Sequence, residues 1–205
     1  MKSWKQITLK QWKHLEEISN KEYEDDILKT ADIISIVYNI DYPMDLTPRE
    51  FSKYVEELSF LTEEIPETKL CNTYTINGTK YNFKGNVYEI NTAQFFDYRK
   101  YSTKDQIDYA ECLSVFMIPD GHTYNDGYDM DKTIKDIETL PITDVMKLYK
   151  FFRSALYLSL HLTQNYLLKT LKQTKISKQK IQEIETKLKE LEEISGTFFL
   201  TSSPM

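Results

Sequence analysis

The chain has 205 residues, of which 40% are hydrophobic and 28% are charged, and its formal net charge at pH 7 is −6. This length and composition are typical of one ordinary globular domain, or of one domain with an appendage. The sequence contains no GxxxxGK[ST] or GxGxxG phosphate loop and no GxSxG nucleophile elbow, which excludes the common nucleotide-binding motifs and the α/β-hydrolase motif.

The charge is distributed unevenly along the chain. Residues 1–70 carry 9 basic and 15 acidic side chains, residues 71–142 carry 7 and 11, and residues 143–205 carry 10 and 6. The protein therefore combines an acidic body with a basic C-terminal arm. Lys outnumbers Arg by 23 to 3, which disfavours base-specific DNA recognition because bidentate contacts to bases favour Arg.

The two cysteines, Cys71 and Cys112, belong to no CxxC motif, and residues 1–10 lack the apolar run of a signal peptide. We therefore expect reduced thiols in a protein made in the cytoplasm. We also expect no membrane span, because the most apolar stretch, residues 151–168, is interrupted by polar side chains. These are Arg153, His161, Gln164 and Asn165.

Three amphipathic helices are predicted before Pro66. Thr8 is placed to cap the first, and the second begins near residues 24–26 and ends near residues 41–43. The third has the clearest start, because Thr47 is followed by Pro48 at the first helical position and by Glu50 at the capping-box position. An apolar stripe at helical spacing follows, formed by Phe51, Tyr54, Val55, Leu58 and Leu61.

A small β-hairpin is predicted near residues 73–90. Apolar and polar residues alternate on both sides of Asn77-Gly78, and both of these residue types tolerate the positive φ of a tight hairpin turn. Residues 87–90 are a candidate third strand. Because an isolated hairpin is marginal in water, we expect this one to lean on the helices or on a neighbouring subunit.

Further short helices are predicted up to residue 141. Thr92 is expected to cap one, and Thr103 is expected to cap another that runs to Met117 and is stopped by Pro119. Residues 130–140 predict a last short helix, which Pro141 ends. An EF-hand interpretation of the polar loop at 120–129 fails, because the ligand positions fall on His122, Tyr124 and Thr133. A turn-rich solvated loop is favoured instead.

One long helix, or a helical hairpin, is predicted from residue 142, capped by Thr143. Residues 145–182 contain eight Lys or Arg residues and no Asp, Glu, Gly or Pro. Apolar residues cover more than one face, which is typical of a helix buried on several sides. The residues expected at a subunit interface are Phe151, Phe152, Leu156, Tyr157, Leu160, Lys169, Lys172, Lys175, Phe198 and Phe199.

The lysine row has three interpretations. It is a solvated helix surface, or it faces an acidic patch on an identical or different subunit, or it lies near phosphates of nucleic acid or lipid. A contact between the basic arm and an acidic body would be head-to-tail, and such contacts close into rings or grow as filaments. Swapping Lys169, Lys172 and Lys175 for Glu should then abolish assembly.

The fold class expected is therefore mainly α (α+β), with several short amphipathic helices, one small hairpin and a long C-terminal helix or helical hairpin. We expect two parts, a compact helical body over residues 1–141 and a helical extension for assembly over residues 142–205. His14, His122 and His161 are scattered, so we expect no zinc site, and we expect no cofactor and no small-molecule substrate.

The order of motifs resembles that of small virion structural proteins of tailed bacteriophages, in particular crAss-like phages. The motifs, which span roughly residues 7–160, are Ile7-Thr8-Leu9-Lys10-Gln11-Trp12, residues 33–40, Leu46-Thr47-Pro48-Arg49-Glu50-Phe51, Leu58-Ser59-Phe60-Leu61, Ile76-Asn77-Gly78-Thr79-Lys80-Tyr81, Ile90-Asn91-Thr92-Ala93-Gln94-Phe95-Phe96-Asp97, Gly127-Tyr128-Asp129 and Leu140-Pro141-Ile142-Thr143-Asp144. Such proteins are similar to neck or tail ring components and also to tail assembly chaperones.

The resemblance implies a non-enzymatic protein that forms a homo-oligomeric ring in the neck or tail and joins portal-proximal parts to the distal tail. Its expected partners are copies of itself and other tail, neck or portal proteins, with non-specific proximity to DNA and no membrane. It would be made in the host cytoplasm and located in the virion. The alternatives are a tail assembly chaperone that is not retained in the virion and, third, an enzyme with an unrecognised carboxylate site.

Overall fold

The computed structural model describes residues 2–83, 90–102, 107–173 and 186, with side chains for all of these except residues 157–168 and 171–173. The elements are, in chain order, the 3-10 helix η1 (Trp4–Gln6), α1 (Leu9–Asn20), α2 (Asp26–Tyr38), the 3-10 helix η2 (Pro43–Asp45), α3 (Pro48–Glu57), the 3-10 helix η3 (Leu58–Thr62), β1 (Thr73–Ile76), β2 (Thr79–Phe83), α4 (Thr92–Ser102), α5 (Tyr109–Ser114), β3 (Met117–Pro119), α6 (Met130–Glu138) and α7 (Ile142–Gln173). The mainly helical prediction with a small antiparallel sheet is confirmed.

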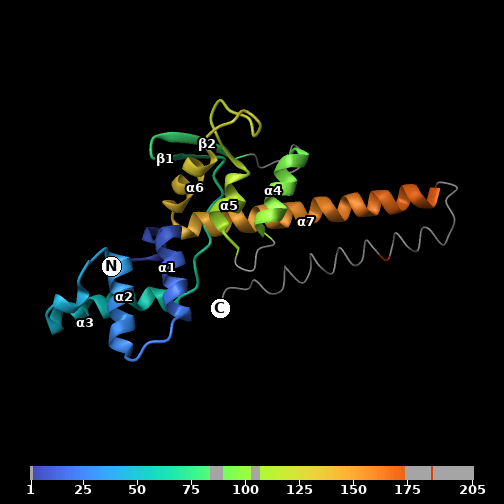
Figure 1. Ribbon diagram of the computed structural model, residues 1–205. Helices are drawn as coiled ribbons and strands as arrows, with labels where there is room; N and C mark the ends of the chain where they lie inside the picture. The colour runs from blue at the N-terminus through green and yellow to red at the C-terminus, as the bar shows by residue number, and fades with distance from the viewer. Residues whose placement is uncertain (1, 84–89, 103–106, 174–185, 187–205) are drawn as a thin grey trace. The chain divides into compact units, whose positions relative to one another are not determined.

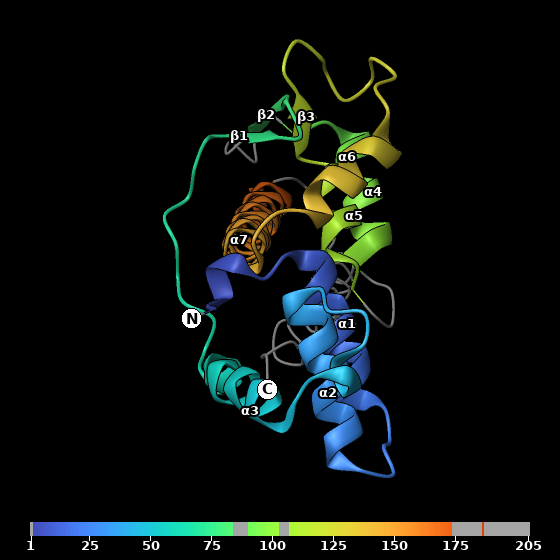
Figure 2. The same ribbon diagram turned by 90° about the vertical axis from the view of Figure 1, so that its left-hand side faces the viewer.

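The chain divides into two compact units, Met1–Lys150 and Phe151–Met205. This division falls inside α7, whereas the sequence analysis drew its boundary between residues 141 and 142. In the first unit, α1 to α3 gather at one end and the sheet lies at the other, with α5 and α6 between them (Figures 1 and 2).

Capping boxes fix the starts of α1 and α3, which confirms the predicted caps Thr8 and Thr47. The Thr8 hydroxyl accepts a hydrogen bond of 3.2 Å from the backbone N–H of Gln11, and Gln11 Oε1 accepts one of 3.0 Å from the N–H of Thr8. Thr47 and Glu50 make the same reciprocal pair, with Pro48 at the first helical position. These bonds satisfy backbone donors that have no partner within the helix.

Two predicted caps are wrong. Asn91 caps α4 in place of Thr92, because its Oδ1 accepts from the N–H of Gln94 at 2.9 Å and Gln94 Oε1 accepts from the N–H of Asn91 at 3.2 Å. The long helix begins one residue earlier than its predicted cap, so Thr143 lies buried inside the first turn of α7. The predicted cap at Thr103 lies outside the described residues.

The hairpin turn has the predicted geometry. Asn77 and Gly78 adopt φ values of 49° and 78°, and Ile76 pairs with Thr79 across them. The third strand of the sheet is β3, which pairs antiparallel with β2. Most of the alternative predicted for it, residues 87–89, lies outside the described residues, and Ile90 lies in no strand.

Residues 115–119 do not continue a helix to Met117, which corrects the prediction. Helix α5 ends at Ser114, and Met117 begins strand β3. A proline disfavours the helical conformation in the residue before it, so Pro119 favours an extended Ile118. Because β3 lies at the sheet edge, Pro119 costs the sheet no interior hydrogen bond.

The first turns of α7 belong to the core of the first unit. Ile142, Val145 and Leu148 have no exposed surface. The N-terminal segment is tied to this point by two backbone hydrogen bonds, from Leu9 N to Leu140 O at 2.9 Å and from Ile142 N to Ile7 O at 2.8 Å. The start of the chain therefore holds the start of the long helix in place.

Candidate functional site

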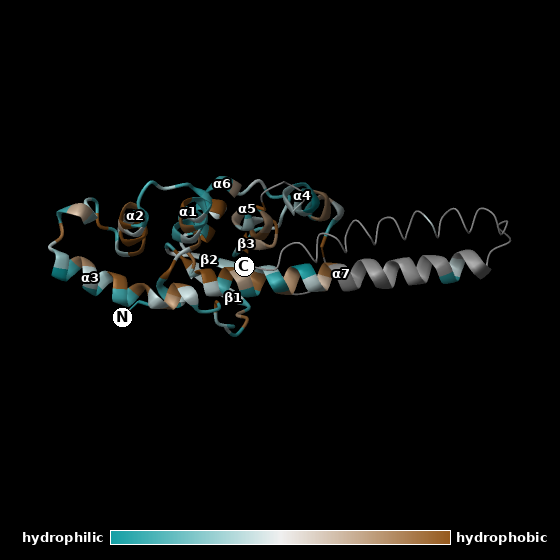
Figure 3. Ribbon diagram, turned by 90° about the horizontal axis from the view of Figure 1, so that it is seen from below, coloured by the Kyte–Doolittle hydropathy of each residue, from teal (hydrophilic) through white to brown (hydrophobic). Residues whose placement is uncertain are grey.

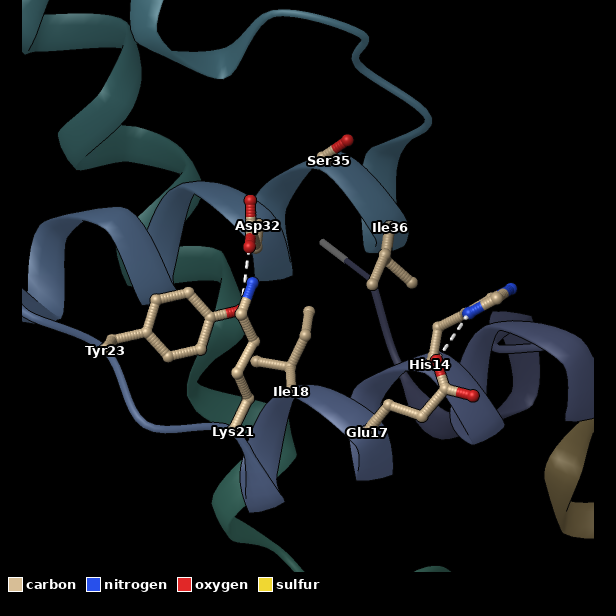
Figure 4. A pocket seen from close by; sticks show the side chains of 8 residues that line it. All are labelled: His14, Glu17, Ile18, Lys21, Tyr23, Asp32, Ser35 and Ile36. Carbon is tan, nitrogen blue, oxygen red and sulfur yellow. Dashed lines mark hydrogen bonds and ion pairs between the residues drawn. The ribbon is translucent and has the colours of Figure 1, made fainter.

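A small hollow lies between α1 and α2, with a volume of about 300 Å³. His14 and Glu17 face it from α1, and Asp32 faces it from α2 (Figure 4). His14 Nδ1 lies 3.2 Å from Glu17, and the Tyr23 hydroxyl donates to Asp32 at 2.7 Å. These polar groups bond in separate pairs, and the described side chains of the hollow do not bring a nucleophile, a base and an anion-stabilising group to one point.

A second hollow, of about 450 Å³, adjoins the first and shares His14 and Ile36 with it. Its polar lining includes Lys2, Lys10 and Gln11, and Gln11 is already engaged in the α1 capping box. Within the described residues, no group of three or more His, Cys, Asp or Glu side chains is placed to hold a metal ion. Among the helices described, none combines the length and apolarity needed to cross a membrane.

Helix α3 is amphipathic, yet none of its residues is buried, although the structure describes all of them. Hydrophobic and hydrophilic residues alternate along it (Figure 3). Phe51 and Tyr54 are half-buried, and Val55 is 42% exposed. The sequence predicted the apolar stripe of this helix, but that stripe is only partly covered by the rest of the unit.

The two ends of α3 are nevertheless firmly anchored. Before the helix, Pro43 is buried in η2. After it, Phe60 is buried in η3 and meets Trp4 edge-on at 5.5 Å, and Trp4 Nε1 donates to Glu63 O at 3.0 Å. Helix α3 is therefore held at both ends while its own side chains stay exposed or half-buried.

The contact of α3 with α2 is mainly aromatic. The rings of Tyr38 and Tyr54 lie 4.6 Å apart, and the Tyr38 hydroxyl donates to Glu57 at 3.1 Å. Burial, and then the neighbouring Glu57 carboxylate, raise the pKa of Tyr38 to about 12. This contact covers one side of α3 and leaves Val55 exposed.

Exposed large hydrophobic side chains concentrate in the same part of the chain. Of those in the described residues, all except Phe96 lie in α2, η2, α3 or the connection between them. They are Ile27, Leu28, Tyr42, Met44 and Val55, with exposed fractions from 42% to 74%. We call the segment from Ile27 to Leu58 the α2–α3 surface.

The α2–α3 surface is acidic. The segment Ile27–Leu58 carries six Asp or Glu and three Lys or Arg. Among the described residues, none of these six acids forms an ion pair. Asp45 precedes the apolar stripe in sequence, Glu56 lies between two of its members, and both are exposed. The α2–α3 surface therefore has three more acids than bases, and none of its acids is held in an ion pair within the described residues.

The predicted interface residues in α7 have different environments. Phe152 has no exposed surface and Leu156 is 6% exposed, so both are already covered within the chain. Phe151 is half-buried, and its ring meets that of Phe152 edge-on at 5.7 Å. Lys169 is exposed.

The remaining predicted interface residues lack described side chains. Tyr157, Leu160 and Lys172 belong to the backbone of α7, but their side chains lie outside the described set. Lys175, Phe198 and Phe199 lie outside the described residues altogether. Sequence analysis placed no interface residue in α3, because helical spacing identifies an apolar face without showing what covers it.

Compared with protein-family models, with curated proteins and with solved structures, the chain has no significant match.

Proposed function

We propose that the protein is a non-enzymatic structural component that assembles with copies of itself into a ring in the neck or tail of a tailed bacteriophage. The observation that carries self-assembly is helix α3, an anchored amphipathic helix without a single buried residue. The phage assignment is supported by the motif order described for residues 7–160.

An uncovered helix of this kind favours association on energetic grounds. A helix of 10 residues is marginal by itself in water, and most helical stability in proteins comes from packing of the apolar face. Fully burying an exposed aliphatic side chain contributes about 1.5–3 kcal/mol. Val55 and Ile27 are 42% and 54% exposed, so covering each of them would contribute about half of that. A partner that covers the α2–α3 surface would therefore gain hydrophobic stabilisation that the single chain leaves unused.

Charge supports the choice of a second copy as that partner. The α2–α3 surface has an excess of acids, none of them in an ion pair among the described residues, whereas residues 145–182 carry eight cations and no acid. Both halves of a complementary contact are thus present in every copy. The same chain would use its remaining surfaces to meet other neck, tail or portal proteins.

The purified protein tests this proposal directly. Light scattering coupled to size-exclusion chromatography should show a discrete oligomer that dissociates as salt rises, because salt screens exposed charges. Negative-stain electron microscopy of the same fraction should show rings. A strictly monomeric protein at high micromolar concentration would contradict the proposal.

Purified phage particles separate the ring component from a tail assembly chaperone. Quantitative mass spectrometry of the virion should find the protein at a fixed copy number that matches the oligomer in solution. Absence from the particle, together with co-purification of a long helical tail protein from infected cells, would favour the chaperone.

A further inference from the structure

We infer that the apolar face of α3, with the acidic residues around it, is the docking site for the lysine-bearing part of α7 from a second copy of the chain. This inference rests on the proposed self-assembly and adds the identity of its acceptor surface. Within the described residues, α3 is the amphipathic helix with no buried position, and its ends are held by Pro43 and Phe60.

The acceptor offers apolar contact and negative charge together. Val55 is 42% exposed on α3, and Met44, just before the helix, is 58% exposed. Asp45 and Glu56 are exposed and form no ion pair within the described residues. An occupant that combines apolar and positively charged side chains would complement this surface.

The second half of α7 has that composition. Lys169 is exposed on α7, and Leu167, Leu168 and Leu171 surround it in sequence. In sequence, Lys172 and Lys175 follow at three-residue spacing. The exposed Lys169 and its leucine-rich sequence surroundings therefore match an acceptor that is apolar and acidic.

Docking of α7 on α3 joins two different surfaces of identical chains. Each copy then donates its α7 to one neighbour and accepts an α7 from another, and such a heterologous contact either closes into a ring or grows as a filament. The contact has no two-fold symmetry, so blocking either half in every copy stops assembly.

Charge reversal with rescue tests the pairing. The acceptor variant carries Asp45→Lys and Glu56→Lys. The donor variant carries Lys169→Glu, Lys172→Glu and Lys175→Glu. Each variant alone should be monomeric by light scattering. When the two are mixed, each donor meets an oppositely charged acceptor, so the oligomer should return. A single chain with all five substitutions should also assemble. Glu22→Lys/Glu24→Lys, in the α1–α2 connection, matches the charge change of the acceptor variant and should assemble normally.

The other outcomes are distinguishable. If the acceptor variant assembles like the wild type, α3 is not the acceptor, and the proposed ring function still stands. If both variants are folded by circular dichroism and monomeric but the mixture is not rescued, the pairing of these charges is wrong. A monomeric wild-type protein would contradict the ring proposal and this inference together.

Discussion

The Tyr81 hydroxyl donates a hydrogen bond of 2.5 Å to Oδ2 of Asp136, which joins the central strand β2 to helix α6. Asp136 is 5% exposed and Tyr81 is 1% exposed. Lys132 Nζ donates to the same oxygen at 2.6 Å, and Asn77 Nδ2 donates to Oδ1 at 2.8 Å. One carboxylate thus receives donors from a helix, a strand and the hairpin turn, and it fixes the small sheet against α6.

Replacing Asp136 by Asn should weaken this attachment. The amide nitrogen of Asn cannot accept the hydrogen bonds that Lys132 and Tyr81 donate to Oδ2, so at least one donor is left unpaired. We expect the free energy of unfolding to fall by about 1–3 kcal/mol, measured by urea denaturation with circular dichroism. Asp131→Asn, at an exposed position of the same helix, is the matched control and should change the free energy little.

A double-mutant cycle with Tyr81→Phe identifies the cause of the loss. Because Tyr81 and Asp136 share a hydrogen bond, Tyr81→Phe should cost less in the Asp136→Asn background than in the wild type. Additive effects of the two substitutions would show that the bond is not the origin of the destabilisation.

Acid should destabilise the fold through Asp136 and Asp108. Burial alone would raise the pKa of Asp136, but hydrogen bonds from Lys132, Tyr81 and Asn77 outweigh it and hold the pKa below its ordinary value. Burial would likewise raise the pKa of Asp108, but the hydrogen bond and the positive charge of Lys13 outweigh it, so the pKa of Asp108 is also lowered. Lys13 Nζ bridges Asp108 and Glu138, at 2.8 Å from each, and so ties α1 to α5 and α6.

The sign of the pH effect follows from these lowered pKa values. An unfolded Asp titrates near pH 3.9, so the stabilisation is fully present above about pH 4 and is lost as the pH falls through the lower folded-state values. Urea denaturation across this range should show a falling free energy of unfolding. The slope should be shallower in Asp136→Asn, and an unchanged slope would count against the contribution of Asp136.

Local chemistry explains which parts of the fold were predictable. The capping box of Thr47 and Glu50 and the Asn77-Gly78 turn depend on residues a few positions apart, so the sequence identifies them. Strand β3 depends on pairing between Ile118 and Asn82, which are distant in sequence. The strand is also only three residues long, and so short an apolar run shows no recognisable period. The cap of α4 was missed because Asn91 and Thr92 are both acceptable capping residues.

The candidate site was less predictable than the fold. Charge counts separate an acidic body from a basic arm, but only burial distinguishes the covered Phe152 from the exposed Val55. Both residues lie in apolar stripes at helical spacing. The spacing therefore predicts an interface role for Phe152 and only a helix face for Val55, whereas Val55 is the more accessible of the two side chains.

Phe152 should behave as a packing residue of the chain. Phe152→Ala removes a side chain with no exposed surface, and we expect it to lower the free energy of unfolding by about 3–5 kcal/mol. If the side chain packs within the chain, the difference from wild type should not depend on protein concentration. Ser154→Ala, at an exposed position of α7, is the control. A loss that appears only at concentrations where the protein assembles would place Phe152 at the interface.

Val55 should affect association more than folding. Val55→Ser replaces an exposed side chain, so the free energy of unfolding of the monomer should stay within about 0.5 kcal/mol of wild type, apart from a small change in helix propensity. Association should weaken about tenfold for each 1.4 kcal/mol of contact energy that is lost at the docking site. Mass photometry over a dilution series measures this change.

Lys53→Gln provides the comparison for Val55→Ser. Lys53 is exposed on α3, and two residues along a helix correspond to a rotation of about 200°, so it lies on the side opposite Val55. The Lys53→Gln substitution should leave association unchanged or strengthen it slightly, because removing a cation makes the acceptor more acidic. Equal effects of the two substitutions would mean that the apolar face of α3 is not what a second copy contacts.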